Sequence, residues 1–165
     1  MFTTPCFIRK NTPELRKQLE ELGYLPPSKM RYDKNFAICT ILRDNVGEYV
    51  VFKIDDDFEN VIKPSYPYID CGTNEELFFA LAALRDDSDK EQWFITYKSS
   101  HPYMDYAAIL CREDKWEDEY VKESQQHNFI DTKPEDYHKA NVKEIIRLYK
   151  DFEEDLKDLY KYDED

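Results

Sequence analysis

The residues from Thr73 to Arg85, TNEELFFALAALR, predict a helix with almost no polar face. Thr73 and Asn74 can each cap its N-terminus, because their side-chain oxygens accept hydrogen bonds from first-turn amides. Two glutamates follow at the positive end of the helix dipole, and the next eight residues are all apolar. Such a helix has to be covered on more than one side. We expect it to lie between a sheet and a second helix.

Short runs rich in Ile, Val, Phe and Thr predict the strands of that sheet. They cover residues 5–9, 36–42 and 48–54, with one short strand before the apolar helix and two after it, up to Cys111. Residues 43–47 join two of these runs as a hairpin loop. Residues 37–42 show little polar alternation, which favours an interior strand that is covered on both faces.

Helices are also predicted near both ends of the chain. Thr12 as N-cap, Pro13 at the first helical position and Gly23 at the end bound the first of them. Shorter helical segments are expected near residues 116–121 and 132–135. A long helix is predicted over residues 142–160. Its apolar stripe consists of Ile145, Ile146, Tyr149, Phe152, Leu156 and Leu159. Because that stripe is too apolar to stay in water, we expect the helix to dock by one face.

Together these elements predict an α+β fold with a single, largely antiparallel sheet of about five to six strands. Two capped helices lie on one face of the predicted sheet, and the C-terminal helices pack beside it. We expect one domain over residues 1–165, with a sheet-and-helix body (1–112) and an acidic helical part (113–165) packed on it. The chain has only 3 glycines and no Gly/Ser tract, so no flexible linker is indicated.

A weak internal repeat is visible at an offset of 62 residues, when Pro5–Leu22 is laid on Pro67–Leu84. Five positions match, but three of the matches are the leucine spacing of any amphipathic helix. A tandem of two strand–helix–strand–strand units is therefore one interpretation, and the predicted order of elements is the same without it.

Charge is distributed unevenly along this chain of net charge -13. Residues 1–34 carry seven basic and four acidic side chains, whereas residues 113–165 carry nine basic and eighteen acidic. The lack of a basic stripe disfavours direct binding to nucleic acid. No segment approaches the ~20 apolar residues of a membrane span, and no secretory pattern is present, so we expect a cytoplasmic protein that binds no membrane. The four cysteines are widely spaced and are expected to be buried free thiols.

No motif in the sequence has the spacing of a known catalytic or metal site. Glycine-rich phosphate loops, HExxH and GxSxG are missing, so no catalytic residue, cofactor or metal is predicted. Asp55, Asp56, Asp57 and Glu59 could hold a divalent cation through oxygen ligands, but the pattern lacks the glycine and the bidentate glutamate of a calcium loop, so a solvated strand end is the favoured interpretation. The three histidines are interpreted as surface residues. One enzymatic alternative remains, with Cys71 at the N-terminus of the apolar helix, where a thiol pKa can be lowered.

The leading hypothesis is a non-catalytic interaction or regulatory protein that acts on a protein partner through an acidic, tyrosine-bearing surface. Tyrosines crowd the predicted strand ends, and tyrosine is favoured at interfaces because it buries a ring and keeps a polar tip. The candidate partner-binding residues are Glu154, Asp155, Asp158, Tyr66, Tyr68 and Tyr103. In one form of the hypothesis the protein is an inhibitor that occupies the basic, nucleic-acid-binding groove of its partner. In size and acidity the chain resembles accessory proteins of bacteriophages and mobile elements.

Overall fold

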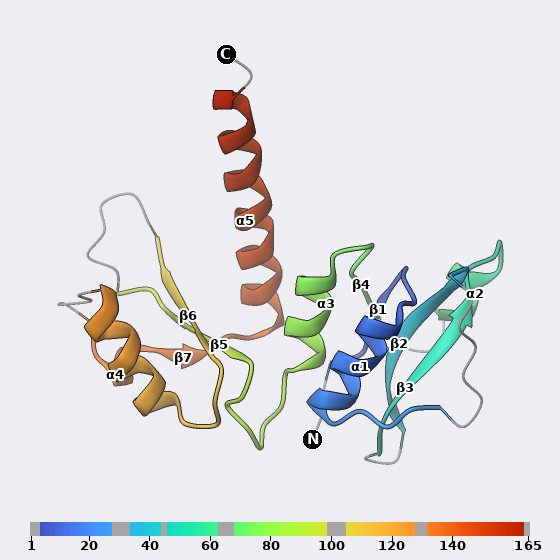
Figure 1. Ribbon diagram of the computed structural model, residues 1–165, viewed down its shortest axis with the longest axis horizontal. Coiled ribbons are helices and arrows are strands. Elements are labelled where there is room, and N and C mark those ends of the chain that lie inside the picture. The colour runs from blue at the N-terminus through green and yellow to red at the C-terminus, as the bar shows by residue number, and fades with distance from the viewer. Residues whose placement is uncertain are drawn as a thin grey trace. The chain divides into compact units, whose positions relative to one another are not determined.

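The computed structural model describes residues 4–27, 34–43, 46–62, 68–98, 105–127 and 132–163. The chain divides into two compact units, Met1–Ser88 and Asp89–Asp165, called here the N-terminal unit and the C-terminal unit (Figure 1). The predicted α+β class is confirmed. The prediction of a single sheet is wrong, because the described strands form one sheet of four and another of three.

The sheet of the N-terminal unit has the order β3-β2-β1-β4. Its strands are β1 (Cys6–Ile8), β2 (Phe36–Arg43), β3 (Val46–Lys53) and β4 (Ile69–Asp70). Strands β1, β2 and β3 are antiparallel neighbours, whereas β4 runs parallel to β1. The predicted interior strand is confirmed, since β2 lies between two others and its described side chains from Phe36 to Thr40 are buried.

Helix α3 (Glu75–Ala82) is covered on two sides, as its composition predicts. It packs against β1 and against helix α1 (Pro13–Leu22). Its N-cap is Asn74, whose side-chain oxygen accepts from the Leu77 amide at 3.1 Å. Thr73, the other predicted cap, is exposed. Of the two candidate caps in the sequence, Asn74 is therefore the one that caps α3.

Helix α1 begins and ends where the sequence predicts. The Thr12 hydroxyl accepts from the Leu15 amide at 3.2 Å, and Gly23 closes the helix with a left-handed φ of 106°. That conformation is readily adopted only by glycine. A short helix that the sequence did not predict, α2 (Phe58–Ile62), follows the charged end of β3.

The proposed repeat agrees with the order of the elements. The caps Thr12 and Asn74 lie 62 residues apart, each bonds the third amide after it, and β1 and β4 are parallel neighbours. The hairpins that follow differ in their pairing. Strands β2 and β3 extend the sheet of β1, whereas the strands after α3 belong to the second sheet. A true duplication stays a prediction.

The C-terminal unit is built on a three-stranded antiparallel sheet of order β6-β5-β7. The strands are β5 (Gln92–Thr96), β6 (Ala107–Cys111) and β7 (His138–Lys139). Strand β5 pairs with β6 on one side and with β7 on the other, so the described strands of this sheet do not pair with the sheet of the N-terminal unit. Because β7 has only two residues, it carries no alternation pattern from which it could be predicted.

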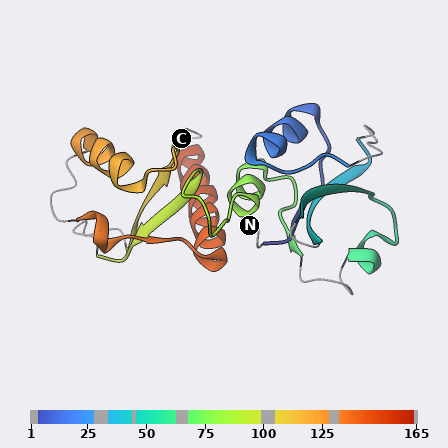
Figure 2. The ribbon, with the colours of Figure 1, turned by 90° about the horizontal axis from the view of Figure 1, so that it is seen from below.

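Helices lie on the two faces of this sheet (Figure 2). Helix α4 (Trp116–His127) covers one face, where the Trp116 ring stacks on Phe94 with centroids 3.9 Å apart. Tyr120 and Tyr137 complete that buried cluster. Helix α5 (Val142–Asp163) follows the 3₁₀ turn Pro134–Asp136 and β7, and covers the other face through Trp93.

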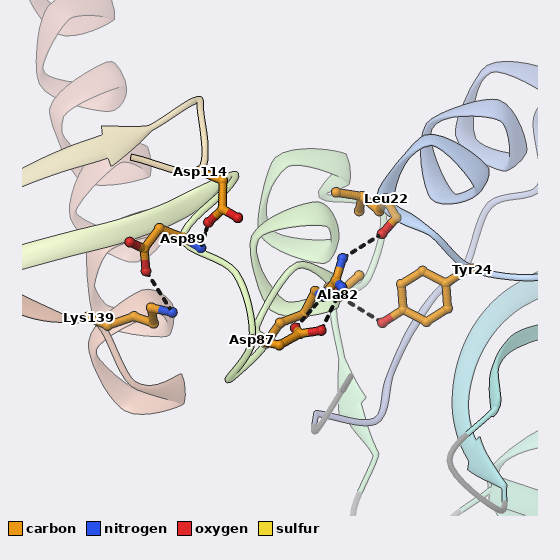
Figure 3. Close-up of polar contacts among 8 residues, drawn as sticks. Leu22, Tyr24, Ala82, Asp87, Asp89, Asp114 and Lys139 are labelled. Carbon is orange, nitrogen blue, oxygen red and sulfur yellow. Dashed lines mark hydrogen bonds and ion pairs between the residues drawn. The ribbon is translucent and has the colours of Figure 1, made fainter. Parts of the chain in front are cut away.

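The segment around Arg85 to Asp89 forms separate contacts in each unit (Figure 3). In the N-terminal unit Arg85 pairs with Asp87 at 2.9 Å and donates to the Leu22 carbonyl at 3.3 Å. The bond from Arg85 lowers the pKa of Asp87. In the C-terminal unit the Asp89 amide donates to Asp114 at 2.6 Å, and the Asp89 carboxylate pairs with Lys139 at 3.2 Å.

The boundary between the two compact units falls at Ser88. The division expected at residue 112, where the composition changes, stays a prediction. Whether the units fold as the expected single domain stays a prediction. None of the helices in the described part of the chain is both long and apolar enough to cross a membrane. The four cysteines are free and buried, as predicted.

Candidate partner-binding surface

The start of α5 is fixed by a reciprocal pair of hydrogen bonds between Asn141 and Glu144. The Glu144 amide donates to the Asn141 side chain at 2.9 Å, and the Asn141 amide donates to the Glu144 carboxylate at 3.1 Å. This is a capping box, which satisfies two otherwise unpaired amides. It also holds the Glu144 carboxylate where Tyr97, the residue after β5, and His138 of β7 reach it.

Glu144 accepts hydrogen bonds from an aromatic and an imidazole side chain. The Tyr97 hydroxyl donates to it at 2.6 Å, and His138 Nε2 lies 2.8 Å from the same carboxylate oxygen. Burial alone would raise the pKa of Glu144, but the bonds from Tyr97, the Asn141 backbone and His138 hold this pKa below its usual range. The bond to the carboxylate raises the pKa of the Tyr97 hydroxyl.

A second tyrosine makes a similar contact with α5 about two helical turns after Glu144. The Tyr106 hydroxyl donates to Asp151 at 2.5 Å, and the Arg147 guanidinium lies 4.9 Å from the centre of the Tyr106 ring. Burial and the bond to Asp151 raise the pKa of Tyr106. Arg147 also pairs with Asp105 at 3.5 Å. These contacts dock α5 against Asp105 and Tyr106, the two residues that precede β6.

The aromatic group of Trp93, Tyr149 and Phe152 lies on the same side of the sheet. Trp93 Nε1 donates to the Tyr149 hydroxyl at 3.2 Å, and the Phe152 ring lies 5.9 Å from Trp93 and 5.4 Å from Tyr149. Trp93 and Tyr149 are half-buried, whereas Phe152 is 37% exposed. Aromatic side chains are enriched at protein interfaces, and Phe152 is the exposed edge of this group.

Three consecutive carboxylates follow Phe152, and Glu153, Glu154 and Asp155 are all exposed. Successive residues of a helix are about 100° apart. Glu153 and Asp155 therefore lie on either side of Phe152, and Glu154 lies on the opposite face of α5. The surface that this helix presents combines an aromatic edge with acidic flanks.

The structure brings some of the predicted partner-binding residues together. Glu154 and Asp155 are exposed neighbours on α5, and Asp158 belongs to the same helix, with its side chain outside the described part. Tyr66 and Tyr103 lie outside the described residues. Tyr68 is in the N-terminal unit, where it packs against the buried cluster of Phe7, Ala37, Cys39 and Phe58. Tyr68 therefore contributes to packing.

The thiol proposed for the enzymatic alternative has the properties of a packing residue. Cys71 is buried, and its hydrogen bond with Cys6 together with burial raises the pKa of the Cys71 thiol. A nucleophilic thiol needs a lowered pKa. Gly72, which follows it, has a left-handed φ of 57° and donates to the Asp70 carboxylate at 2.8 Å. The glycine thus serves the turn before α3.

The acidic run at the end of β3 remains in solvent. Asp55, Asp56 and Asp57 are exposed, and the Asp55 carboxylate accepts from the Asp57 amide at 3.1 Å. Within the described ranges no group of three or more His, Cys, Asp or Glu side chains is placed to hold a metal ion.

Sequence reasoning missed the cluster of Tyr97, His138 and Glu144. His138 was interpreted as a surface residue, and half of its side chain is indeed exposed, but it bonds to a carboxylate six residues away. The pattern Asn141-x-x-Glu144 is readable as a capping box and could have placed Glu144 at the helix start. Its neighbours across β5 and β7 could not be read from one sequence.

Comparison with known proteins returned no match among family models, curated proteins or solved structures. The candidate surface therefore rests on the geometry and charge described above.

Proposed function

We propose that the protein is a non-catalytic interaction protein, and that it binds a basic protein partner through α5. The observation that carries this proposal is the exposed Phe152 with carboxylates beside it on the same helix. Aromatic side chains supply much of the binding energy at interfaces, and complementary charge steers and orients the partner. The buried Cys71 gives the enzymatic alternative no support.

We further propose that the protein is cytoplasmic, and that it is an accessory or inhibitory protein of the type that phages and mobile elements carry. Residues 113–165 hold eighteen acidic and nine basic side chains, so this part of the chain repels nucleic acid and attracts a basic surface. A partner that itself binds nucleic acid offers such a surface. By occupying that surface, the protein would act as an inhibitor.

The test is affinity capture from the native host with two charge-reversed variants. The first carries Glu154→Lys, Asp155→Lys and Asp158→Lys on α5. Its matched control carries Glu117→Lys, Asp118→Lys and Glu135→Lys, three side chains that are exposed elsewhere on the C-terminal unit. Both variants change the net charge equally, so only a site on α5 distinguishes them.

We expect the wild type and the control to recover the same partner and the α5 variant to lose it. Binding of the purified partner should weaken steeply between low and physiological salt, because the Debye length shortens from about 30 Å to about 8 Å. Recovery of the partner by the α5 variant at wild-type yield would refute the proposal. So would a partner lost equally from both variants.

A further inference from the structure

Strand β6 lies at one end of the C-terminal sheet, and β5 is its only neighbour among the described strands (Figure 1). The Trp93 carbonyl of β5 accepts from the Ala140 amide at 2.8 Å, so the backbone groups of Trp93 face β7. Trp93 stands opposite Leu110 of β6, and two opposite residues of an antiparallel pair either bond each other or both face away. The backbone groups of Leu110 therefore point outward, and so do those of Ala108 two residues earlier.

This outer edge of β6 is unpaired and carries no protective side chain. None of the described hydrogen bonds involves the outward amides and carbonyls of Ala108 and Leu110. The strand reads AAILC, with neither a charged residue nor a proline. Native sheets often protect an edge with such residues, because unpaired backbone groups can bind a further strand. The β6 edge is therefore open to such pairing.

The edge strand β3 of the N-terminal unit shows how an edge is protected elsewhere in this chain. The Leu25 amide donates to the Gly47 carbonyl at 2.6 Å, and the Tyr49 amide donates to the Leu25 carbonyl at 3.2 Å. Glu48 and Lys53 add charged side chains along the same strand. Within the described residues β6 has neither a bonded neighbour on its outer side nor a charge. This contrast singles out β6 as the edge that suits a partner.

The side chains along the β6 edge leave room for larger neighbours. Ala107, Ala108 and Leu110 are half-buried, so part of each remains in contact with solvent. A strand beside β6 would place its own side chains next to these three. Cross-strand pairs stabilise a sheet most when they include aromatic or β-branched residues, and the two alanines leave space for them. The edge therefore favours an apolar, bulky strand.

Acidic side chains flank this uncharged strand at both ends. Asp105 precedes it, and 89% of the Asp105 side chain is exposed although Arg147 lies 3.5 Å away. Residues 112–119, which follow the strand, carry five acidic and two basic side chains. Exposed ion pairs contribute little, so these carboxylates remain available to a ligand. The charge pattern fits an extended segment with Lys or Arg at its ends.

The same charges disfavour a second copy of this chain as the occupant. Two copies of β6 that overlap in full, antiparallel about a two-fold axis, place Asp105 of one copy opposite Glu113 of the other. That like-charge contact occurs twice, because a two-fold interface repeats each contact. Each copy also carries a net charge of -13. A basic-ended segment of a different protein meets neither repulsion.

We propose that the edge of β6 binds an extended segment of a protein partner, which adds one strand to the C-terminal sheet. Its backbone bonds the outward groups of Ala108 and Leu110, and its bulky apolar residues lie beside the alanines. Lys or Arg residues at its ends pair with the flanking carboxylates. This is recognition by strand addition, in which backbone bonds give affinity and side chains give specificity. The site is separate from the α5 surface of the proposed function.

The test uses synthetic peptides with the full-length protein. The probe is a fluorescent peptide of about nine residues, a usual strand length, with alternating valine and tyrosine in the centre and lysines at both ends. A second peptide has the same charge and prolines in the centre, so it cannot pair as a strand. A third keeps the centre and has glutamates at its ends. We expect the probe to bind at least about tenfold more tightly than either control in fluorescence anisotropy.

Amide hydrogen exchange identifies the edge directly. In the free protein the amides of Ala108 and Leu110 should exchange fast, whereas the Ile109 amide, which faces β5, should exchange slowly. The bound probe should slow Ala108 and Leu110 and leave Ile109 nearly unchanged. Protection of other segments without these two amides would place the peptide elsewhere and overturn the inference.

Variants of the protein provide the matched comparison. Ala108→Pro removes an outward amide without touching the bonds to β5 and should weaken the probe at least about tenfold, whereas Ala108→Val keeps that amide and should bind like the wild type. The pair Asp105→Lys with Glu113→Lys should also weaken binding. Its control of equal charge change is Glu21→Lys with Asp56→Lys, at two exposed positions of the N-terminal unit, and should change the affinity less than about twofold.

Four further results would overturn the inference. Wild-type affinity in Ala108→Pro would exclude the β6 edge, and equal binding of the proline peptide would mean attraction by charge alone. A wild-type dimer in sedimentation that Ala108→Pro converts to a monomer would make a second copy the occupant. Loss of the probe from the α5 charge-reversed variant would place the site on α5. If the probe fails while the host partner still depends on α5, strand addition is rejected and the proposed function stands.

Discussion

At the scale of single residues, the Glu144 carboxylate is held by polar contacts from three different residues. Tyr97, His138 and the Asn141 amide all donate to it or lie within bonding distance of it. A depressed carboxyl pKa contributes stability that is present above the pKa of the unfolded chain and is lost as pH falls through the folded pKa. The C-terminal unit should therefore lose stability below about pH 4.

We predict that Glu144→Gln lowers the free energy of unfolding by about 1.5 to 3 kcal/mol at neutral pH, the usual size for hydrogen bonds to a charged group. The loss should shrink toward acid pH, where the wild-type carboxylate is also neutralised. Urea unfolding at neutral and acid pH measures both effects. Glu117→Gln, at an exposed position, is the control and should change little. A loss for Glu144→Gln that is constant with pH would contradict this electrostatic account.

At the scale of elements, the two candidate caps of α3 make separate predictions. Asn74→Ala removes the oxygen that accepts from the Leu77 amide and should cost about 0.5 to 2 kcal/mol. Thr73→Ala alters an exposed side chain and should cost less than about 0.5 kcal/mol. Chemical denaturation of the two variants measures the difference. Equal costs would mean that the capping role is shared.

These helices also show how far one sequence can predict structure. The bounds of α1 were predictable because Thr12, Pro13 and Gly23 each act on the residues next to them. The sheets were not, because β5 pairs with the two-residue strand β7 more than forty positions later, and so short a strand has no pattern. The candidate site divides in the same way. Glu154 and Asp155 were predictable as exposed from the pattern of their own helix, whereas the bond between His138 and Glu144 depends on the pairing of β7 and was not predictable.

At the scale of the whole molecule, the division into two compact units predicts that each unit can unfold separately. Leu81→Ala empties a fully buried position of α3 and should cost about 2 to 5 kcal/mol. We predict that amide hydrogen exchange of this variant accelerates in residues 6–82, whereas the slow amides of β5 and β6 keep their wild-type rates. Equal acceleration in both units would instead show one cooperative domain, as the sequence led us to expect.

The parallel pairing of β1 with β4 has a consequence during synthesis on the ribosome. Hydrogen bonds from Ile69 to Pro5, from Cys71 to Phe7 and from Arg9 to Gly72 close the edge of the first strand with residues made some sixty positions later. At about 5 to 20 residues per second, several seconds pass before those partners are translated. Until then the edge of β1 that β4 will cover lacks these backbone partners, so this edge of the sheet can be completed only late in synthesis.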